Sequence, residues 1–429
     1  MKRKISAYLE WWKNLGKDRM PLLLSGARQI GKTYILQEFA AENYRNTVYL
    51  NFETNPILSQ LFGDSIDPHK LVPKIEMYFN TQITPGKTLL IFDEIQNCNR
   101  ALTSMKYFYE IAPEYDLIGV ASLLGVFISA KDYSFPVGKV ISKTMYPLNF
   151  EEFMWETDKA TFASAIQESY INNTPLDQDI HESMLELYRE YLFVGGMPLA
   201  IYNYFSNNQI LPYNSVQKTV TDTHVSDISR YTSNSQSVKT TNTYYSINSQ
   251  LAKENRKFQY KLIKKGARAS LFGESIDWLV RAGVVIKCDR ITAGNVPPNM
   301  ARDLSSFKLY MCDVGLAVCR SELTRENISY FDKTILEGLT ENYVACMLAS
   351  NDYELYYWSS DAQAEVDFVI MKDGKPVPIE VKAGDNVRSL SLNSYMKKYN
   401  PDYAIRISSK NFGYKNGIKS VPLYAAYLI

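Results

Sequence analysis

Short apolar segments alternate with amphipathic stretches over the first 150 residues. Continuous apolar runs at 21–25, 48–52, 87–94 and 116–124 are typical of buried strands, and the periodicity between them is that of helices. Strands that alternate with helices favour a parallel sheet with helices on its faces. We therefore expect an α/β core domain over residues 1–150.

The pattern becomes helical after this domain. The segments NFEEFMW and HESMLELYREYLF have helical periodicity, and a break follows at VGGMP. Residues 206–246 are rich in Ser, Thr and Asn, so this stretch is either a linker or an exposed helix. We predict a small helical lid and linker over residues 151–235.

Two further domains are predicted in the second half of the chain. Within residues 236–328, a basic stretch and SLFGESIDWLVRAG have helical patterns and precede the strands VVIKCDRI and FKLYM, an order typical of a winged helix-turn-helix. Within residues 329–429, a helix precedes YELYYW, AEVDFVIM and KPVPIEV. The sequence Lys372-Asp373-Gly374-Lys375 predicts a hairpin turn between the last two, so we expect a third, α/β unit.

The composition narrows the classes of protein to consider. Apolar residues at 46%, charged residues at 22% and a net charge of +1 fit a globular protein without a basic field over its whole surface. The five cysteines form no CxxC pair and there are three histidines, so neither a disulfide framework nor a zinc site is indicated. No apolar run is long enough to span a bilayer, and we expect a cytoplasmic protein without a membrane partner.

A phosphate-binding loop pattern lies between the first strand and the first helix. The spacing is Gly26-x4-Gly31-Lys32-Thr33. In this pattern, backbone N–H groups cradle phosphates, the lysine reaches the terminal phosphates, and the hydroxyl binds Mg²⁺. A plain glycine turn is the alternative, less favoured because a strand and a helix flank the loop. We expect ATP and Mg²⁺ here, with contacts from Gly26, Ala27, Arg28, Gln29, Ile30, Gly31, Lys32, Thr33 and Tyr34.

A second motif, LLIFDEIQ, ends an apolar strand in Asp93-Glu94. Alone it fits an ordinary strand terminus equally well. Together with the loop it is more specific, because an ATPase needs a carboxylate near Mg²⁺ and a residue that orients water. We predict that Asp93 joins Thr33 at the metal and that Glu94 and Lys32 are catalytic. Ser122, at the end of the next strand, is either a sensor of the γ-phosphate or attacking water, or an ordinary buried strand end.

The C-terminal region contains three acids and a lysine in a suggestive arrangement. Across the predicted hairpin Asp367 and Glu380 lie close, while Glu380 and Lys382 share one sheet face. With Glu341 from the preceding helix, these groups suit Mg²⁺-dependent phosphodiester cleavage, in which carboxylates hold the ion and the lysine stabilises charge. The alternative is an ordinary cross-strand charge pattern.

The segment KENRKFQYKLIKKGAR carries seven basic residues and one acid. It is either a solvated face or an element that contacts nucleic-acid phosphates, in which case binding weakens with salt. The candidate contacts are Lys253, Arg256, Lys257, Lys261, Lys264, Lys265 and Arg268.

The chain resembles bacterial AAA-type P-loop ATPases whose C-terminal domain looks like a restriction endonuclease. The resemblance covers nearly the whole chain, through GARQIGKT, FDEIQ, PVGKVISKTMYPLNFEEF, YLFVGGMPLAI, QLAKENRKFQYKLIKKGARA, FKLYMCDVGL, TENYV, AEVDF, PIEVKAG and YAIRIS. It implies a PD-(D/E)XK nuclease-like fold, with Glu341 as its additional helix acid. Folds do not carry activity with them, so cleavage and binding alone both stay open.

In such ATPases an arginine before the last core strand often reaches into a neighbour's site. Lys139 stands there in this chain and lacks the fork geometry of arginine, so a homo-oligomer with shared sites stays open. We expect a Mg²⁺-dependent ATPase that acts on nucleic acid, DNA being favoured. The alternative is a nucleotide-regulated, non-catalytic scaffold whose partner is a protein.

Overall fold

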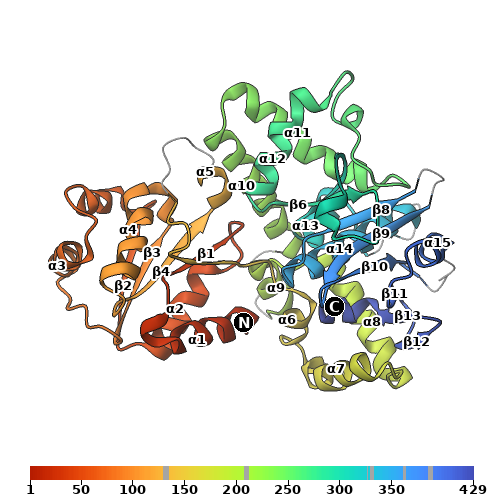
Figure 1. The fold of residues 1–429 in the computed structure, drawn as a ribbon, viewed down its shortest axis with the longest axis horizontal. Coiled ribbons are helices and arrows are strands. Elements are labelled where there is room, and N and C mark those ends of the chain that lie inside the picture. The colour runs from red at the N-terminus through yellow and green to blue at the C-terminus, as the bar shows by residue number, and fades with distance from the viewer. Residues whose placement is uncertain (129–134, 207–211, 326, 329–332, 361–363, 385–389) are drawn as a thin grey trace. The chain divides into compact units, whose positions relative to one another are not determined.

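The computed structural model describes residues 1–429 except 129–134, 207–211, 326, 329–332, 361–363 and 385–389 (Figure 1). The chain divides into two compact units. The first comprises residues 1–146 with 281–283, and the second comprises residues 147–280 with 284–429.

The first unit contains a five-stranded parallel sheet in the order β2-β3-β4-β1-β5. Every residue of β3 and β4 is buried, as the apolar runs predict. The expected parallel sheet with helices is therefore confirmed. Its strands are β1 (Leu22–Gly26), β2 (Asn46–Asn51), β3 (Thr88–Asp93), β4 (Asp116–Ser122) and β5 (Ile141–Thr144), and its helices are α1 (Lys4–Asn14), α2 (Lys32–Asn43), α3 (Pro68–Phe79), α4 (Asn99–Ile111) and α5 (Leu124–Ile128).

The second unit contains a mixed eight-stranded sheet in the order β12-β13-β11-β10-β9-β8-β6-β7 (Figure 1). Its strands are β6 (Val285–Ile291), β7 (Arg302–Met311), β8 (Tyr356–Ser359), β9 (Glu365–Lys372), β10 (Lys375–Val381), β11 (Ala404–Ser408), β12 (Gly413–Lys415) and β13 (Ile418–Pro422).

Ten α-helices follow residue 146 within the described residues. They are α6 (Phe150–Met154), α7 (Ala163–Asn172), α8 (Gln178–Val194), α9 (Pro198–Phe205), α10 (Tyr213–Tyr231), α11 (Asn234–Leu251), α12 (Ala269–Arg281), α13 (Val314–Arg320), α14 (Lys333–Ser350) and α15 (Leu390–Tyr399). Residues 338–349 of α14 are all buried, as expected for a helix enclosed on every side. For the polar stretch 206–246, α10 and α11 decide between linker and helix in favour of helices; residues 207–211 of it lie outside the described residues.

The hairpin of β9 and β10 confirms the predicted turn. Lys375 pairs with Lys372, and the two residues between them, Asp373 and Gly374, have φ values of 50° and 77°. Positive φ at both positions is the requirement of a type I′ turn. The resulting register aligns Ile379 with Phe368, which places Glu380 and Asp367 at the next position.

The strand pair predicted for the winged helix is present as β6 and β7. However, β6 also pairs in parallel with β8, so the pair extends the C-terminal sheet instead of forming a small sheet of its own. The predicted helix at 253–268 is wrong, because among these residues only 260–262 form a 3₁₀ turn. Tertiary contacts override the local pattern: the N–H of Phe258 donates to the carbonyl of Phe307 at 2.9 Å and their rings stack.

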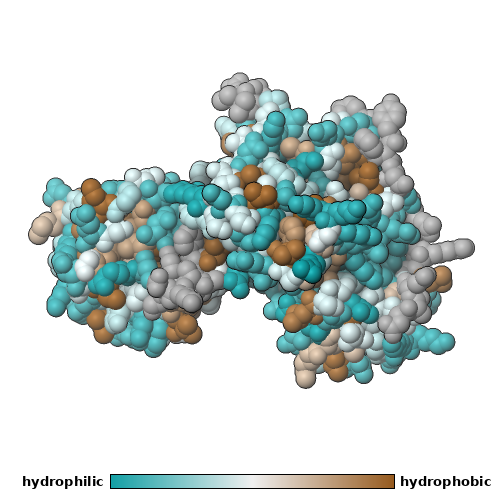
Figure 2. All heavy atoms as spheres, turned by 90° about the horizontal axis from the view of Figure 1, so that it is seen from above, coloured by the Kyte–Doolittle hydropathy of each residue, from teal (hydrophilic) through white to brown (hydrophobic). Residues whose placement is uncertain are grey.

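In the part of the chain that the structure describes, no helix combines the length and apolar character needed to cross a membrane. The molecular face in Figure 2 is largely hydrophilic, with scattered apolar patches.

Candidate nucleotide site and C-terminal acid cluster

The loop between β1 and α2 depends on its two glycines. Gly26 has φ 147°, and a Cβ there would lie 2.3 Å from the carbonyl oxygen of Met145. Gly31, which precedes the first residue of α2, has φ 87°. Between them Gln29 also adopts a left-handed conformation, with φ 65°. Only glycine fits this close approach at position 26, so the loop geometry is built into the sequence.

Lys32 is buried directly after the loop. Its ammonium donates to the carbonyls of Gly26 at 3.0 Å and Ala27 at 2.7 Å. Burial lowers the pKa of Lys32 to about 8, although Glu94 and Asp93 oppose this shift. An anionic ligand held by the loop would restore the ammonium's preference for its charged form.

Thr33 and Asp93 meet at the ends of α2 and β3. The Thr33 hydroxyl donates to Oδ2 of Asp93 at 2.9 Å. The same oxygen accepts a hydrogen bond from the hydroxyl of Tyr49, and the Asn51 amide lies 3.4 Å away. Two hard oxygen ligands within hydrogen-bond distance of each other fit a shared Mg²⁺ ion. The two predicted metal residues are therefore together.

Glu94 is held by two neighbours. It follows β3 in a left-handed conformation, with φ 48°. Its carboxylate accepts hydrogen bonds from the Ser122 hydroxyl at 2.8 Å and from the Gln96 amide. Ser122 reaches this position because the register of β1 and β4 aligns it with Gly26. Loop, acids and serine thus converge at the carboxyl edge of the parallel sheet, where such sheets bind ligands.

Other predicted residues of this region lie around the loop. Ala27 and Ile30 are buried, Tyr34 is exposed, and Arg28 pairs with Glu53 at 3.3 Å. Lys139, at the position expected for an arginine finger, pairs with Glu110 of its own chain at 3.3 Å. A homo-oligomer remains a prediction.

Sequence reasoning missed three residues of this site: Tyr49, Asn51 and Gln96. Asn51 pairs with Asp93 in the β2–β3 register, and Gln96 lies two residues after Glu94. For Tyr49 and Asn51, the available signal was the polar positions in the otherwise apolar strand VYLN.

The second unit brings the predicted C-terminal residues into one region. Asp367 Oδ2 accepts the backbone N–H of Val381 at 2.8 Å, and Lys382 pairs with Glu380 at 2.8 Å. Glu341, on α14, is almost completely buried. We call Glu341, Glu365, Asp367 and Glu380 the acid cluster.

Two cations that sequence reasoning did not place here enter the acid cluster. The Lys308 ammonium, from β7, lies 2.9 Å from Glu341 and 2.8 Å from Glu365. The Arg256 guanidinium lies 2.6 Å from Glu341. Burial would raise the pKa of Glu341, but Arg256 and Lys308 outweigh it and hold that pKa below its ordinary value. Within the described residues, no three His, Cys, Asp or Glu side chains are grouped so that they could hold one metal ion.

The seven predicted nucleic-acid contacts divide into two sets. Arg256 also pairs with Glu337, and Lys257 pairs with Glu365, both at 3.3 Å, so these two face acids. The other five are exposed, namely Lys253, Lys261, Lys264, Lys265 and Arg268.

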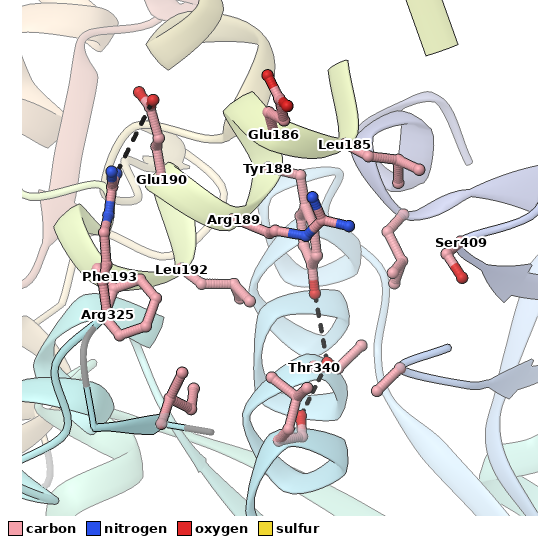
Figure 3. Close-up of a pocket in the computed structure, with 14 residues that line it drawn as sticks. Leu185, Glu186, Tyr188, Arg189, Glu190, Leu192, Phe193, Arg325, Thr340 and Ser409 are labelled. Atoms are coloured by element: carbon pink, nitrogen blue, oxygen red, sulfur yellow. Dashed lines mark hydrogen bonds and ion pairs between the residues drawn. The ribbon is translucent and has the colours of Figure 1, made fainter. Parts of the chain in front are cut away.

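A separate cavity of about 520 Å³ lies between α8 and α14 (Figure 3). Its walls are largely apolar. The Tyr188 hydroxyl donates to Thr340 at 3.3 Å, and Arg325 lies 3.9 Å from Glu190 at its edge. No sequence pattern predicted this cavity.

Three segments of the chain match known families. Residues 18–154 match an AAA domain, residues 185–327 a domain of unknown function (DUF8612), and residues 336–426 another domain of unknown function (DUF4143). The chain therefore contains a P-loop ATPase domain of the AAA type, which confirms that part of the resemblance. The winged-helix and nuclease-like assignments remain predictions.

One curated relative is an uncharacterized protein of Methanocaldococcus jannaschii, 23% identical over 228 residues. The match covers 50% of this chain and 44% of that protein, so the chain spans less than half of the relative's length.

Several solved structures match this chain at low sequence identity and low TM-score. The Walker-type ATPase of Pyrococcus abyssi is 15% identical, covers 75% of this chain and 95% of its own, and has a TM-score of 0.44. The Aeropyrum pernix ORC2 protein is 13% identical, with coverages of 76% and 95% and a TM-score of 0.36. The Aeropyrum pernix ORC1 protein in complex with DNA is 13% identical, with coverages of 75% and 93% and a TM-score of 0.29.

Proposed function

We propose that this chain, through its AAA domain, is a Mg²⁺-dependent ATPase whose nucleotide state controls its binding to DNA. The observation that carries the proposal is the 2.9 Å contact of Thr33 with Asp93 beside the glycine loop, with Glu94 one residue further on. In this proposal the residues that bind phosphate, metal and water all lie at one edge of the sheet.

Each residue of the site has a distinct task in this proposal. The loop N–H groups and the Lys32 ammonium bind the phosphates. Thr33 and Asp93 would hold Mg²⁺, which neutralises charge on the phosphates when bound. Glu94 orients the attacking water and accepts its proton, while Ser122 and Gln96 fix the carboxylate. Tyr49 and Asn51 fix the orientation of Asp93 through the hydrogen bonds they donate to it.

Nucleotide binding is expected to depend on pH through Lys32. Its pKa of about 8 in the free protein rises when anionic phosphates bind, so binding above pH 8 takes up a proton. The affinity for ATP then falls as the pH rises, by up to about tenfold per pH unit. Titration calorimetry at pH 8.5 in buffers of different ionisation enthalpy measures this uptake.

The control for this experiment is Lys32→Arg, whose guanidinium keeps its charge at pH 8.5. It is expected to bind ATP without proton uptake. Equal proton uptake by wild type and Lys32→Arg would contradict the role of Lys32.

The five exposed cations of the basic segment support DNA binding. They form a local basic surface on a chain with a net charge of only +1. The nuclease-like fold is part of the proposal, supported by the β9–β10 hairpin beside α14. The winged-helix fold is proposed on the order of α12, β6 and β7 alone, because this strand pair also belongs to the C-terminal sheet. We further propose that the second unit binds DNA without cleaving it, because cations of the chain itself occupy the acid cluster.

Combined replacement of Lys261, Lys264 and Lys265 by alanine is expected to weaken DNA binding. Each lysine that no longer binds a phosphate reduces the magnitude of the negative slope of log K against log salt by about 0.9, so the magnitude falls by about 2.7 if all three bind DNA. Filter retention of DNA and RNA, with and without ATP, measures the effect. If the chain is instead a scaffold that binds a protein partner, neither DNA nor RNA is retained on the filter.

The matched control replaces three exposed lysines elsewhere in the second unit, Lys397, Lys410 and Lys415. It removes the same charge and is expected to leave the slope unchanged. If both triple variants lower the slope equally, the basic segment is not the contact surface. If RNA is retained more strongly than DNA, the proposed ligand class is wrong.

A further inference from the structure

We infer that the acid cluster is closed by the chain's own cations: Lys308 and Arg256 take the place of a divalent ion, and the cluster anchors the basic segment instead of serving as a metal centre. The closure of the cluster does not depend on the proposed ATPase or DNA-binding function. Only the purpose of the anchored segment rests on that proposal.

Lys308 lies at the centre of the cluster. It is fully buried, and its ammonium lies 2.9 Å from Glu341, 2.8 Å from Glu365 and 3.9 Å from Asp367. Burial lowers the pKa of Lys308, but these carboxylates outweigh it and raise that pKa above its ordinary value, so the side chain stays charged. A divalent ion shared by the same acids would have to displace this ammonium.

Both oxygens of Glu341 are already occupied. Oε1 accepts from Lys308 and from the Tyr310 hydroxyl, and Oε2 accepts from Arg256 at 2.6 Å. The guanidinium of Arg256 cannot lose its proton in a protein. Glu341, the helix residue of the predicted nuclease site, therefore already forms ion pairs through both oxygens.

The two hairpin acids offer little more to a metal ion. Oδ2 of Asp367 accepts the N–H of Val381, and burial, followed by Glu341 and Glu380, raises the pKa of Asp367. Oε1 of Glu380 pairs with Lys382. Oε2 of Glu380 is buried and has no hydrogen-bond partner among the described atoms, and Oδ1 of Asp367 lies 3.9 Å from the Lys308 ammonium, beyond hydrogen-bond distance. An arriving cation would therefore find two oxygens that are not held by a close hydrogen bond. These two oxygens do not replace the three acids that the sequence predicted, because Glu341 is already paired with Lys308 and Arg256.

The same contacts fix the basic segment on the second unit. Arg256 adopts a left-handed conformation, with φ 47°, which is unfavourable for a residue with a side chain. Its pairs with Glu341 and Glu337 hold it there, and Lys257 adds a pair with Glu365. With these two cations turned inward, the other five remain exposed for a polyanion.

Manganese binding to the whole 429-residue chain without nucleotide tests the inference. Electron paramagnetic resonance counts bound Mn²⁺ per chain in wild type and in the double variant Asp367→Asn/Glu380→Gln. The two proteins are expected to bind equally, and any site at Asp93 is common to both. Loss of one bound Mn²⁺ per chain in the double variant would overturn the inference.

A gain of binding is expected when the central cation is removed. Mn²⁺ should raise the thermal midpoint of Lys308→Met by more than that of wild type, because any site at Asp93 contributes equally to both proteins. An equal rise in both proteins, or no rise in a folded Lys308→Met, contradicts the placement of Lys308. If Lys308→Met does not fold, the comparison of Mn²⁺ binding by wild type and by the double variant still tests the inference.

Cleavage assays provide an independent readout. Wild type and Asp367→Ala are expected to leave DNA and RNA equally intact in Mg²⁺ or Mn²⁺. Cleavage by wild type that Asp367→Ala loses would show an open metal centre and refute the inference, whether or not the chain hydrolyses ATP.

Discussion

Replacing Glu94 with glutamine is expected to lower the kcat of ATP hydrolysis by about 10²- to 10⁴-fold while ATP still binds. The amide keeps the shape of the side chain but cannot accept a proton from water. Because Asp93, Thr33 and Lys32 are unchanged, the phosphates keep their proposed contacts. Phosphate release under steady-state conditions gives kcat, and equilibrium titration gives the affinity for ATP.

Glu42→Gln is the matched control for this variant. Glu42 lies on α2 of the same domain and is exposed, so its replacement removes one carboxylate without touching the site. It is expected to keep the kcat of wild type. If Glu94→Gln hydrolysed ATP at the wild-type rate, Glu94 would have no catalytic role.

Replacing Lys308 with methionine is expected to destabilise the second unit by about 3–5 kcal/mol. Methionine fills a similar volume but leaves Glu341 and Glu365 without their shared cation. Removal of one partner from a buried ion pair is costly because the remaining charge stays in a poorly solvated site. Urea unfolding followed by circular dichroism measures the change in the free energy of unfolding.

The control is Lys264→Met, which removes an exposed lysine of the basic segment. Its effect is expected to stay within about 0.5 kcal/mol. The chain has two compact units, so two unfolding transitions are expected, and the destabilisation should appear in one of them. A destabilisation below about 1 kcal/mol for Lys308→Met would show that the buried ion pairs contribute little.

The nucleotide site could be predicted from the sequence because its geometry is local. The spacing from Gly26 to Thr33 defines the strand, loop and helix start, and the parallel sheet then places Asp93 and Ser122 at the same edge. The β9–β10 turn was predictable for the same reason, since Asp373 and Gly374 fix its type.

Contacts between distant segments could not be predicted in this way. Arg256 and Glu341 are 85 positions apart, and nothing near either residue indicates the other. Residues 253–268 have a helical pattern but form no helix, because contacts with β7, such as the stacking of Phe258 on Phe307, outweigh the local preference. Likewise, the parallel pairing of β6 with β8 is a long-range choice that local periodicity does not encode.

The acid cluster shows how a motif can be present while its chemistry is changed by its surroundings. The residues Asp367, Glu380 and Lys382 lie where the predicted hairpin places them. Lys308, however, belongs to β7, a strand that we predicted to be part of a different domain, and it lies 3.9 Å from Asp367. The types and spacing of residues define a candidate site, but the neighbouring charges decide which ion it holds.

Equilibrium binding of ATP in magnesium buffer tests the central claim, that the loop from Gly26 to Thr33 binds the triphosphate. Wild type is expected to saturate with one ATP per chain, and Lys32→Ala, which removes the ammonium, is expected to show no saturable binding at the same concentrations. Equal affinity in both proteins, or no binding by wild type, would contradict the account.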